Sequence, residues 1–174
     1  DIDQSVYGGS FLWLRDYSCR INGYSDDGNR VKVEASHDGY LRLKDPLIHK
    51  RKVQFDRETR TIVVEETFEC RKLHKCTVLW HLSPRCKLYQ NGGHITVSSG
   101  ELQLSCELSG PDLVARVVCG QEDPPLGWHS ASFYHKEATN VIVAEATVSA
   151  GSMVRSVFRL RSGERTSFVE AFPS

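Results

Sequence analysis

The stretch "RKVQFDRETRTIVVEETF" at residues 51–68 holds the pattern that decides the fold. Its two halves are rich in valine, phenylalanine and threonine, and the polar run "DRET" at 56–59 separates them. Two such runs joined by a short polar turn are typical of an antiparallel hairpin. The sequence therefore predicts two neighbouring strands in this stretch.

The same kind of pattern continues on both sides of this hairpin. Residues 30–35, "RVKVEA", alternate apolar and charged side chains, as a half-buried strand does. Residues 87–119 read as four strands cut by the turns "NGG", "SSGE" and "SGPD", and residues 140–163 as two strands around "SAGS". "TSFVEAF" at 166–172 has the composition of one more strand. Two apolar faces are expected in 140–163, one of Ile142, Ala144, Ala146 and Val148, and another of Val154, Ser156, Phe158 and Leu160.

These strands indicate an all-β fold. Turn signals recur roughly every eight to twelve residues, the spacing of an antiparallel sandwich. No long apolar pattern of helical period occurs with a cap before it and a glycine after it. We therefore expect a two-sheet antiparallel β-sandwich, similar to a supersandwich, with little or no helix. With 174 residues, 40% of them hydrophobic, a single domain over residues 1–174 is predicted.

The charge balance argues against a polyanion as a general partner. Lysine and arginine number 22, as do aspartate and glutamate, so no global field would draw the chain onto nucleic acid. No apolar run approaches the roughly 20 residues that a membrane span needs. We expect no nucleic-acid partner and no membrane span, and any charge-based binding site is expected to be local.

Six cysteines are scattered among strand-like residues. A chain of this size does not need disulfides to fold, so the predicted state is reduced and buried. Cys70 and Cys76 in "CRKLHKC" leave an alternative open, because a hairpin would place them opposite one another. Free thiols are favoured there over a disulfide.

His37 lies in "EASHDGYLRL", residues 34–43, and has two interpretations. In the first, its imidazole binds a metal with Asp16 or Asp38 as the oxygen ligand. In the second, Asp38 and Gly39 form a turn in which Gly39 takes a positive φ, and His37 makes a hydrogen bond at the end of the strand. The residues alone favour the turn.

Two further segments are candidates for binding an acidic sugar polymer. Arg51 lies in the basic run "HKRKVQFDR" at 49–57, which suits either carboxylate and sulfate recognition or a solvated strand. Residues 120–139 are predicted to form a long loop, where Trp128 would either stack on a sugar ring or hold the loop onto the core. Trp80, within a strand, is predicted to belong to the core.

Five stretches of the sequence stand out when taken in order: "DQSVYGGSFLWLRDY", "VEASHDGYLRL", "HKRKVQFDRETRTIVVEE", "HKCTVLWHLSP" and "PPLGWHSASFYHKE". They cover most of the chain, from about residue 3 to about residue 160. Together they resemble the C-terminal β-sandwich of the heparinase II/III-like polysaccharide lyases.

The resemblance implies a function in cleaving acidic, uronic-acid-containing polysaccharides by β-elimination. In this family an N-terminal helical toroid packs against the sandwich, and a tyrosine or histidine serves as base and acid. We therefore expect an excised C-terminal part of a larger lyase, inactive without the helical domain of the same polypeptide. The residues expected to contact the polysaccharide are His37, Arg51, His74 and Trp128.

The resemblance also implies a zinc ion in the full-length protein. Some family members bind zinc in the sandwich through an upstream histidine, an aspartate and a second histidine, and Asp16 and His37 fall where the last two could be. The chain alone is expected to hold no cofactor. The family is often secreted or periplasmic, whereas unpaired cysteines favour a reducing compartment. Two other functions stay open, a non-catalytic carbohydrate-binding or interaction sandwich and a metal-dependent enzyme built on His37, His74 and His81.

Overall fold

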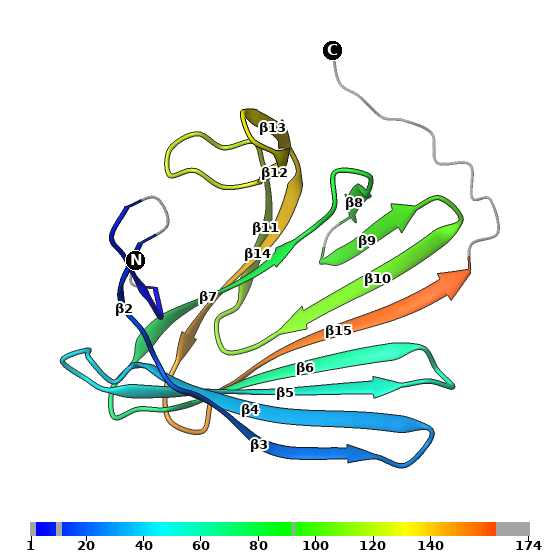
Figure 1. Cartoon of the computed structure of the whole chain (residues 1–174). Helices are drawn as coiled ribbons and strands as arrows, with labels where there is room; N and C mark the ends of the chain where they lie inside the picture. The colour runs from blue at the N-terminus through cyan, green and yellow to red at the C-terminus, as the bar shows by residue number, and fades with distance from the viewer. Residues whose placement is uncertain (1–2, 10–11, 92, 163–174) are drawn as a thin grey trace.

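Antiparallel strands joined by short turns make up the computed structural model, which describes residues 3–9, 12–91 and 93–162. An eight-stranded sheet and a three-stranded sheet form two layers, and two small hairpins lie beside them (Figure 1). The described part of the chain contains no helix, and so no helix long and apolar enough to span a membrane. This confirms the predicted all-β sandwich.

The eight-stranded sheet forms the larger layer. In order across the sheet, its strands are β3 (Cys19–Asp26), β4 (Arg30–Tyr40), β5 (Leu47–Asp56), β6 (Thr61–Glu69), β15 (Met153–Ser162), β10 (Leu102–Ser109), β9 (His94–Ser99) and β8 (Lys87–Asn91). The strands β5 and β6 are the hairpin predicted from residues 51–68, with the reversal at the predicted turn. The last described strand, β15, lies between β6 and β10.

The three-stranded sheet crosses over one face of the larger sheet (Figure 1). In order, its strands are β11 (Val114–Cys119), β14 (Asn140–Val148) and β7 (His74–His81). The two hairpins are β1 (Val6–Tyr7) with β2 (Trp13–Arg15), and β12 (Trp128–Ser132) with β13 (His135–Ala138).

The core lies between the two sheets and follows the predicted alternation. The predicted face of β14 is buried throughout, and Val154, Ser156 and Phe158 of β15 are buried as well. The other face of β14 is also buried, because Val141 and Val143 pack with Val118 and Leu126. The segment that contains Leu126 therefore covers the outside of the smaller sheet.

Trp80 of β7 joins the two layers, as the sequence predicted for a core residue. Its indole Nε1 donates a hydrogen bond to the hydroxyl of the buried Ser156, with 3.1 Å between the two atoms. Its ring packs edge-on against Phe158, with 4.8 Å between the ring centroids. Both partners are on β15, so this one side chain ties the smaller sheet to the larger one.

The predicted turn at Asp38 and Gly39 is present, but its backbone differs from the expected one. The N–H of Leu41 donates to the carbonyl of Asp38 at 2.9 Å, which closes a turn over residues 38–41 at the end of β4. Gly39 does not have a positive φ. Its role is close packing, because a Cβ at this position would lie 2.7 Å from the carbonyl oxygen of Gln4. The register with β5 shifts between His37 and Tyr40, so the Asp-Gly pair also interrupts the regular pairing of β4.

The predicted long loop at 120–139 is partly structured. It contains the β12–β13 hairpin, whose tip is the exposed pair Phe133 and Tyr134. The short strands of this hairpin are too irregular for the alternation rule to detect. The predicted strand at 166–172 lies outside the described residues.

All six cysteines are free thiols, Cys70 and Cys76 among them. The prediction that they are buried is confirmed for Cys106 alone. Cys70, Cys76 and Cys86 are half-buried, and the prediction is wrong for Cys19 and Cys119, which are exposed. The physical reason is their place in the sheets, since β3 and β11 are edge strands and these residues lie at strand ends. Burial raises the pKa of the Cys76 thiol to about 11 and that of Cys106 to about 12, so both favour the unreactive thiol form.

Candidate functional site

Three neighbouring strands bring polar side chains together in the interior of the sandwich. In the register of β4, β5 and β6, His37 lies opposite His49, and Arg51 lies opposite Glu66. The Nε2 atom of His37 is 2.9 Å from Nδ1 of His49, and Nε2 of His49 is 2.6 Å from a carboxylate oxygen of Glu66. We call these four residues the His-Glu-Arg cluster.

Glu66 is the buried centre of this cluster, with only 1% of its surface exposed. Its second oxygen accepts a hydrogen bond from Nε of Arg51 at 2.8 Å, and a terminal guanidinium nitrogen of Arg51 forms an ion pair with the same oxygen at 2.7 Å. Burial alone would raise the pKa of Glu66, but the hydrogen bonds from His49 and Arg51 outweigh it, so the pKa is lowered. Glu66 is therefore an anion held inside the sandwich.

The hydrogen bonds assign a neutral form to both histidines. The backbone N–H of Gly39 donates to Nδ1 of His37, so the proton of His37 is on Nε2 and points to Nδ1 of His49. The proton of His49 is then on Nε2 and is donated to Glu66. Burial lowers the pKa of His37, which agrees with its neutral form.

Aromatic rings surround the two histidines of the His-Glu-Arg cluster. The rings of Tyr17 and Tyr40 each lie 5.4 Å from that of His37, measured between centroids. The ring of Phe68 stacks on His49 at 5.4 Å. These contacts fix the orientation of both imidazoles.

Arg51 is the member of the cluster that reaches solvent. Its side chain is 48% exposed, and its guanidinium carbon lies 5.9 Å from the centroid of the Trp80 ring. The two N–H groups that face Glu66 leave the others available, because a guanidinium carries five. An anchored, half-exposed guanidinium of this kind is suited to binding a carboxylate or sulfate group.

His74 belongs to a different arrangement. Its Nε2 atom is 2.7 Å from a carboxylate oxygen of Asp45 in the segment between β4 and β5. The same oxygen accepts the backbone N–H groups of Lys72 and Arg71 at 2.9 and 3.3 Å. These hydrogen bonds, that of His74 first, lower the pKa of Asp45. His74 thus ties two loops together, and its role in substrate binding stays a prediction.

Trp128 lies in the β12–β13 hairpin, well away from β4 and β5 (Figure 1). Its Nε1 donates to the carbonyl of Gln121 at 2.8 Å, and the ammonium of Lys136 lies 3.9 Å from its ring centroid. These contacts favour the interpretation in which Trp128 holds the loop in place. Its role in sugar stacking stays a prediction.

The two predicted zinc ligands do not form a complete site. Asp16 lines a shallow hollow with Asp38 and Arg42, and both ring nitrogens of His37 have hydrogen-bond partners. Within residues 3–9, 12–91 and 93–162, no group of three or more histidine, cysteine, aspartate or glutamate residues could hold a metal ion. A zinc ion in a longer protein stays a prediction that needs a ligand from outside this set.

Sequence reasoning missed Glu66 and the role of His49. A signal for Glu66 was present, because it shares the strand face of Ile62, Val64 and Phe68, where a charge is unexpected. A charged residue in the apolar phase of a strand indicates a buried partner. In the sequence, His49 was apparent only as the first residue of the basic run at 49–57.

Comparisons with known proteins identify the family. The family model described as "Heparinase II/III-like, C-terminal" matches residues 1–162. The chain belongs to the heparinase II/III-like family. The heparan sulfate lyase HepC from Pedobacter heparinus has a similar structure, with a TM-score of 0.67, 14% identity, and coverage of 85% of this chain and 22% of that chain. A crystal structure of heparinase III gives a TM-score of 0.67 at 10% identity, covering 90% of this chain and 24% of that one.

The chain spans less than a quarter of the length of these two solved proteins. A search of curated proteins found no matching sequence. The family match confirms the resemblance to the C-terminal region of heparinase II/III-like proteins. At identities this low, the similarity to the solved lyases shows the shared fold alone.

Acid is expected to destabilise this member of the family through the His-Glu-Arg cluster. The pKa of His37 is lower in the folded chain than the usual 6.5, so the unfolded chain binds more protons as the pH falls below that value. The lowered pKa of Glu66 acts in the same direction below about 4.5. We expect the urea midpoint to fall between about pH 7.5 and about pH 5, across the usual histidine range.

Substitution of His37 tests the origin of this pH dependence. His37→Gln keeps a donor for His49 but does not titrate, so its urea midpoint should change less over the same pH interval. His135→Gln, in the exposed hairpin, is the control and should retain the wild-type slope. Equal slopes for all three proteins would contradict the assignment of a neutral, buried His37.

Proposed function

We propose that this chain is the sandwich domain of a polysaccharide lyase, which supports β-elimination cleavage of an acidic, uronic-acid-containing polymer together with an N-terminal helical domain of the same polypeptide. The family match over residues 1–162 is the observation that carries the proposal. The heparan sulfate lyase among the similar structures supports a substrate with carboxylate and sulfate groups. The catalytic base and acid would come from the helical domain.

Arg51 is the proposed contribution of the sandwich to substrate binding. In β-elimination the proton α to the uronate carboxylate is removed, and negative charge moves onto that carboxylate. A fixed guanidinium beside it stabilises this charge, provided that the guanidinium is already oriented. Glu66 and Trp80 supply that orientation for Arg51, and its exposed N–H groups can reach a ligand.

His37 and His49 are proposed as positioning residues. They complete the hydrogen bonds of Glu66, which in turn holds Arg51. Both ring nitrogens of His37 are engaged, so direct contact with the polymer would first require the Gly39 hydrogen bond to open. This arrangement supports an indirect role for His37 more than a direct one.

Binding of defined polysaccharides by the purified chain tests the proposal. By titration calorimetry, heparin and heparan sulfate should bind, and Arg51→Gln should weaken binding about tenfold, as expected when a charge-assisted hydrogen bond is lost. Arg116→Gln is a matched control, because Arg116 is 47% exposed and pairs with a glutamate, as Arg51 does. The control should bind like the wild type.

Activity measurements complete the test. The chain alone should release no unsaturated uronate product, which absorbs ultraviolet light, whereas a longer polypeptide with the helical domain should release it. Product from the chain alone would overturn the need for a second domain. If Arg51→Gln and Arg116→Gln bind heparin with equal affinity, Arg51 is not part of the binding site.

A further inference from the structure

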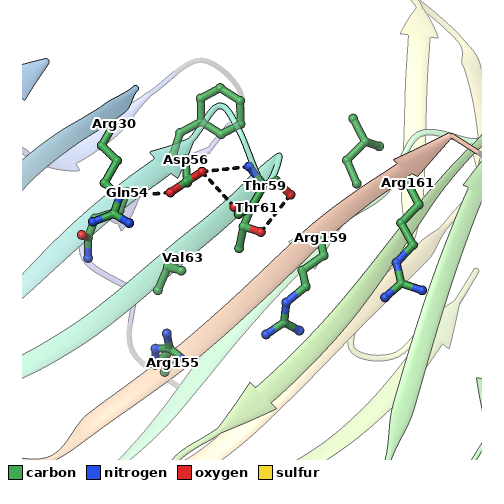
Figure 2. Close-up of a pocket in the computed structure, with 11 residues that line it drawn as sticks. Arg30, Gln54, Asp56, Thr59, Thr61, Val63, Arg155, Arg159 and Arg161 are labelled. Atoms are coloured by element: carbon green, nitrogen blue, oxygen red, sulfur yellow. Dashed lines mark hydrogen bonds and ion pairs between the residues drawn. The ribbon is translucent and has the colours of Figure 1, made fainter. Parts of the chain in front are cut away.

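A second cluster of arginines lies on the opposite face of the large sheet. In β15, the buried Val154, Ser156 and Phe158 face the core, so alternation turns Arg155, Arg159 and Arg161 to the outer face. Figure 2 shows Arg159 and Arg161 extending in the same direction from β15. With neighbouring side chains of β5 and β6, the three arginines line a shallow hollow of about 550 Å³, here called the β15 hollow.

The β15 hollow has more cations than anions along its lining. Its charged residues are Arg30, Asp56 and the three arginines of β15. Asp56 is satisfied locally: it accepts Thr59 N–H and Oγ1 at 2.9 Å each, and Arg30 Nε at 3.0 Å. These contacts, the Thr59 backbone first, lower the pKa of Asp56 to about 2. Asp56 therefore does not compensate the arginines of β15.

The arginines of β15 are only partly neutralised by other residues. Arg159 pairs with Glu107 at 2.5 Å, and the oxygen of Glu65 nearest Arg155 is 3.5 Å away, while Lys52 also pairs with Glu65. The side chain of Arg161 forms no hydrogen bond or ion pair with any residue that the structure describes. The side-chain amide of Gln54, also in the lining, has no partner in the same set of residues. The side chains of Arg161 and Gln54 thus offer donors without an acceptor, while the carboxylate partners of Arg155 and Arg159 lie outside the lining of the hollow.

The spacing of these donors fits an extended polymer. From the strand rise, Arg155 and Arg159 are about 13 Å apart along β15, and Arg159 and Arg161 about 7 Å. Several guanidinium groups in a row are suited to successive oxyanions of a chain, each paired through two N–H groups. A small anion would use only one of them.

We propose that the β15 hollow is a second binding site for the acidic polysaccharide, which holds its carboxylate or sulfate groups outside the sandwich interior. The inference rests on the proposed function, because that supplies the polymer. Arg51 points to the inner face of β5, whereas Gln54 and the β15 arginines are on the outer face, so the two sites bind separate stretches of polymer. The second site would keep a long polysaccharide close to the domain while it is not bound at the site of Arg51.

The experiment compares the double variant R159Q/R161Q with R51Q and with the control R116Q, using the purified chain and heparin at several salt concentrations. We expect the double variant to bind about tenfold more weakly, with a shallower dependence of affinity on salt because fewer counterions are released. R116Q should match the wild type. Far-ultraviolet circular dichroism of each variant verifies the fold.

Further ligands identify the anion. Hyaluronan carries only carboxylates, and dextran sulfate carries only sulfates. The polymer that the double variant binds more weakly than the wild type does identifies the anionic group that the site recognises. Wild-type affinity of R159Q/R161Q together with weaker binding by R51Q would overturn the second site and leave the proposed function intact. Absence of heparin binding by the wild type would overturn both. Single-stranded DNA serves as a polyanion of another class. If it binds as tightly as heparin, and if R159Q/R161Q weakens both affinities equally, the β15 hollow is not a site for polysaccharide.

Discussion

Replacing Glu66 by alanine is expected to lower the free energy of unfolding by about 3 kcal/mol, the low end of the range for breaking a buried ion pair. The carboxylate is 1% exposed and is the only group that His49 and Arg51 share among the described residues. Its removal leaves a guanidinium without its buried partner. The loss is at the low end because Arg51 is half exposed and water can solvate it. Urea unfolding measures the change.

Glu145→Ala is the control for this prediction. Glu145 is 50% exposed and pairs with Arg116, so it is also a glutamate in an ion pair with arginine. An exposed pair of this kind contributes less than about 1 kcal/mol. If the two variants unfold at the same urea concentration, Glu66 does not stabilise the interior in the way its contacts indicate.

Replacing Trp80 by alanine is expected to cost about 3–5 kcal/mol, the usual range for removing a large aromatic side chain from a core. Trp80 packs against both main clusters of buried residues and bonds to β15. Its loss would leave a cavity between the two sheets and an unpaired hydroxyl on the buried Ser156. Thermal and urea unfolding would both shift.

Two further variants separate the packing of Trp80 from its hydrogen bond. Trp80→Phe keeps most of the ring against Phe158 and loses the donor to Ser156, so a cost of about 1–2 kcal/mol is expected. Leu79→Ala removes the neighbouring side chain, which is 40% exposed, and should cost less than Trp80→Ala. An equal cost for Leu79→Ala and Trp80→Ala would contradict the proposed link between the sheets.

The sequence predicted local features of the fold because they depend on neighbouring residues. The hairpin at 51–68 and the apolar face of β14 follow from alternation and turn residues alone. The turn at Asp38 and Gly39 was also predicted, but the positive φ of Gly39 was wrong, because here the close approach of Gln4 is what requires the glycine. That contact spans more than thirty residues and leaves no local pattern.

The candidate site was predicted residue by residue but not as an arrangement. His37 and Arg51 were singled out from the sequence, and the register of β4, β5 and β6 places them around Glu66. Register depends on bulges such as the one after His37, which a single sequence does not fix. His74 and Trp128 were predicted for the same site, and the structure places each with other partners.

The position of β15 has a consequence for how the protein folds during synthesis. The strands β3 to β6 and β8 to β10 are synthesised before β15. The strand β15 joins these two groups into one sheet and is the last of the described strands. Until Met153 and the residues after it emerge, β6 and β10 each present an unpaired edge, the kind of surface on which nascent chains aggregate. A pairing so distant in sequence also makes folding slow, so completion of the sheet is the step that a chaperone would have to protect.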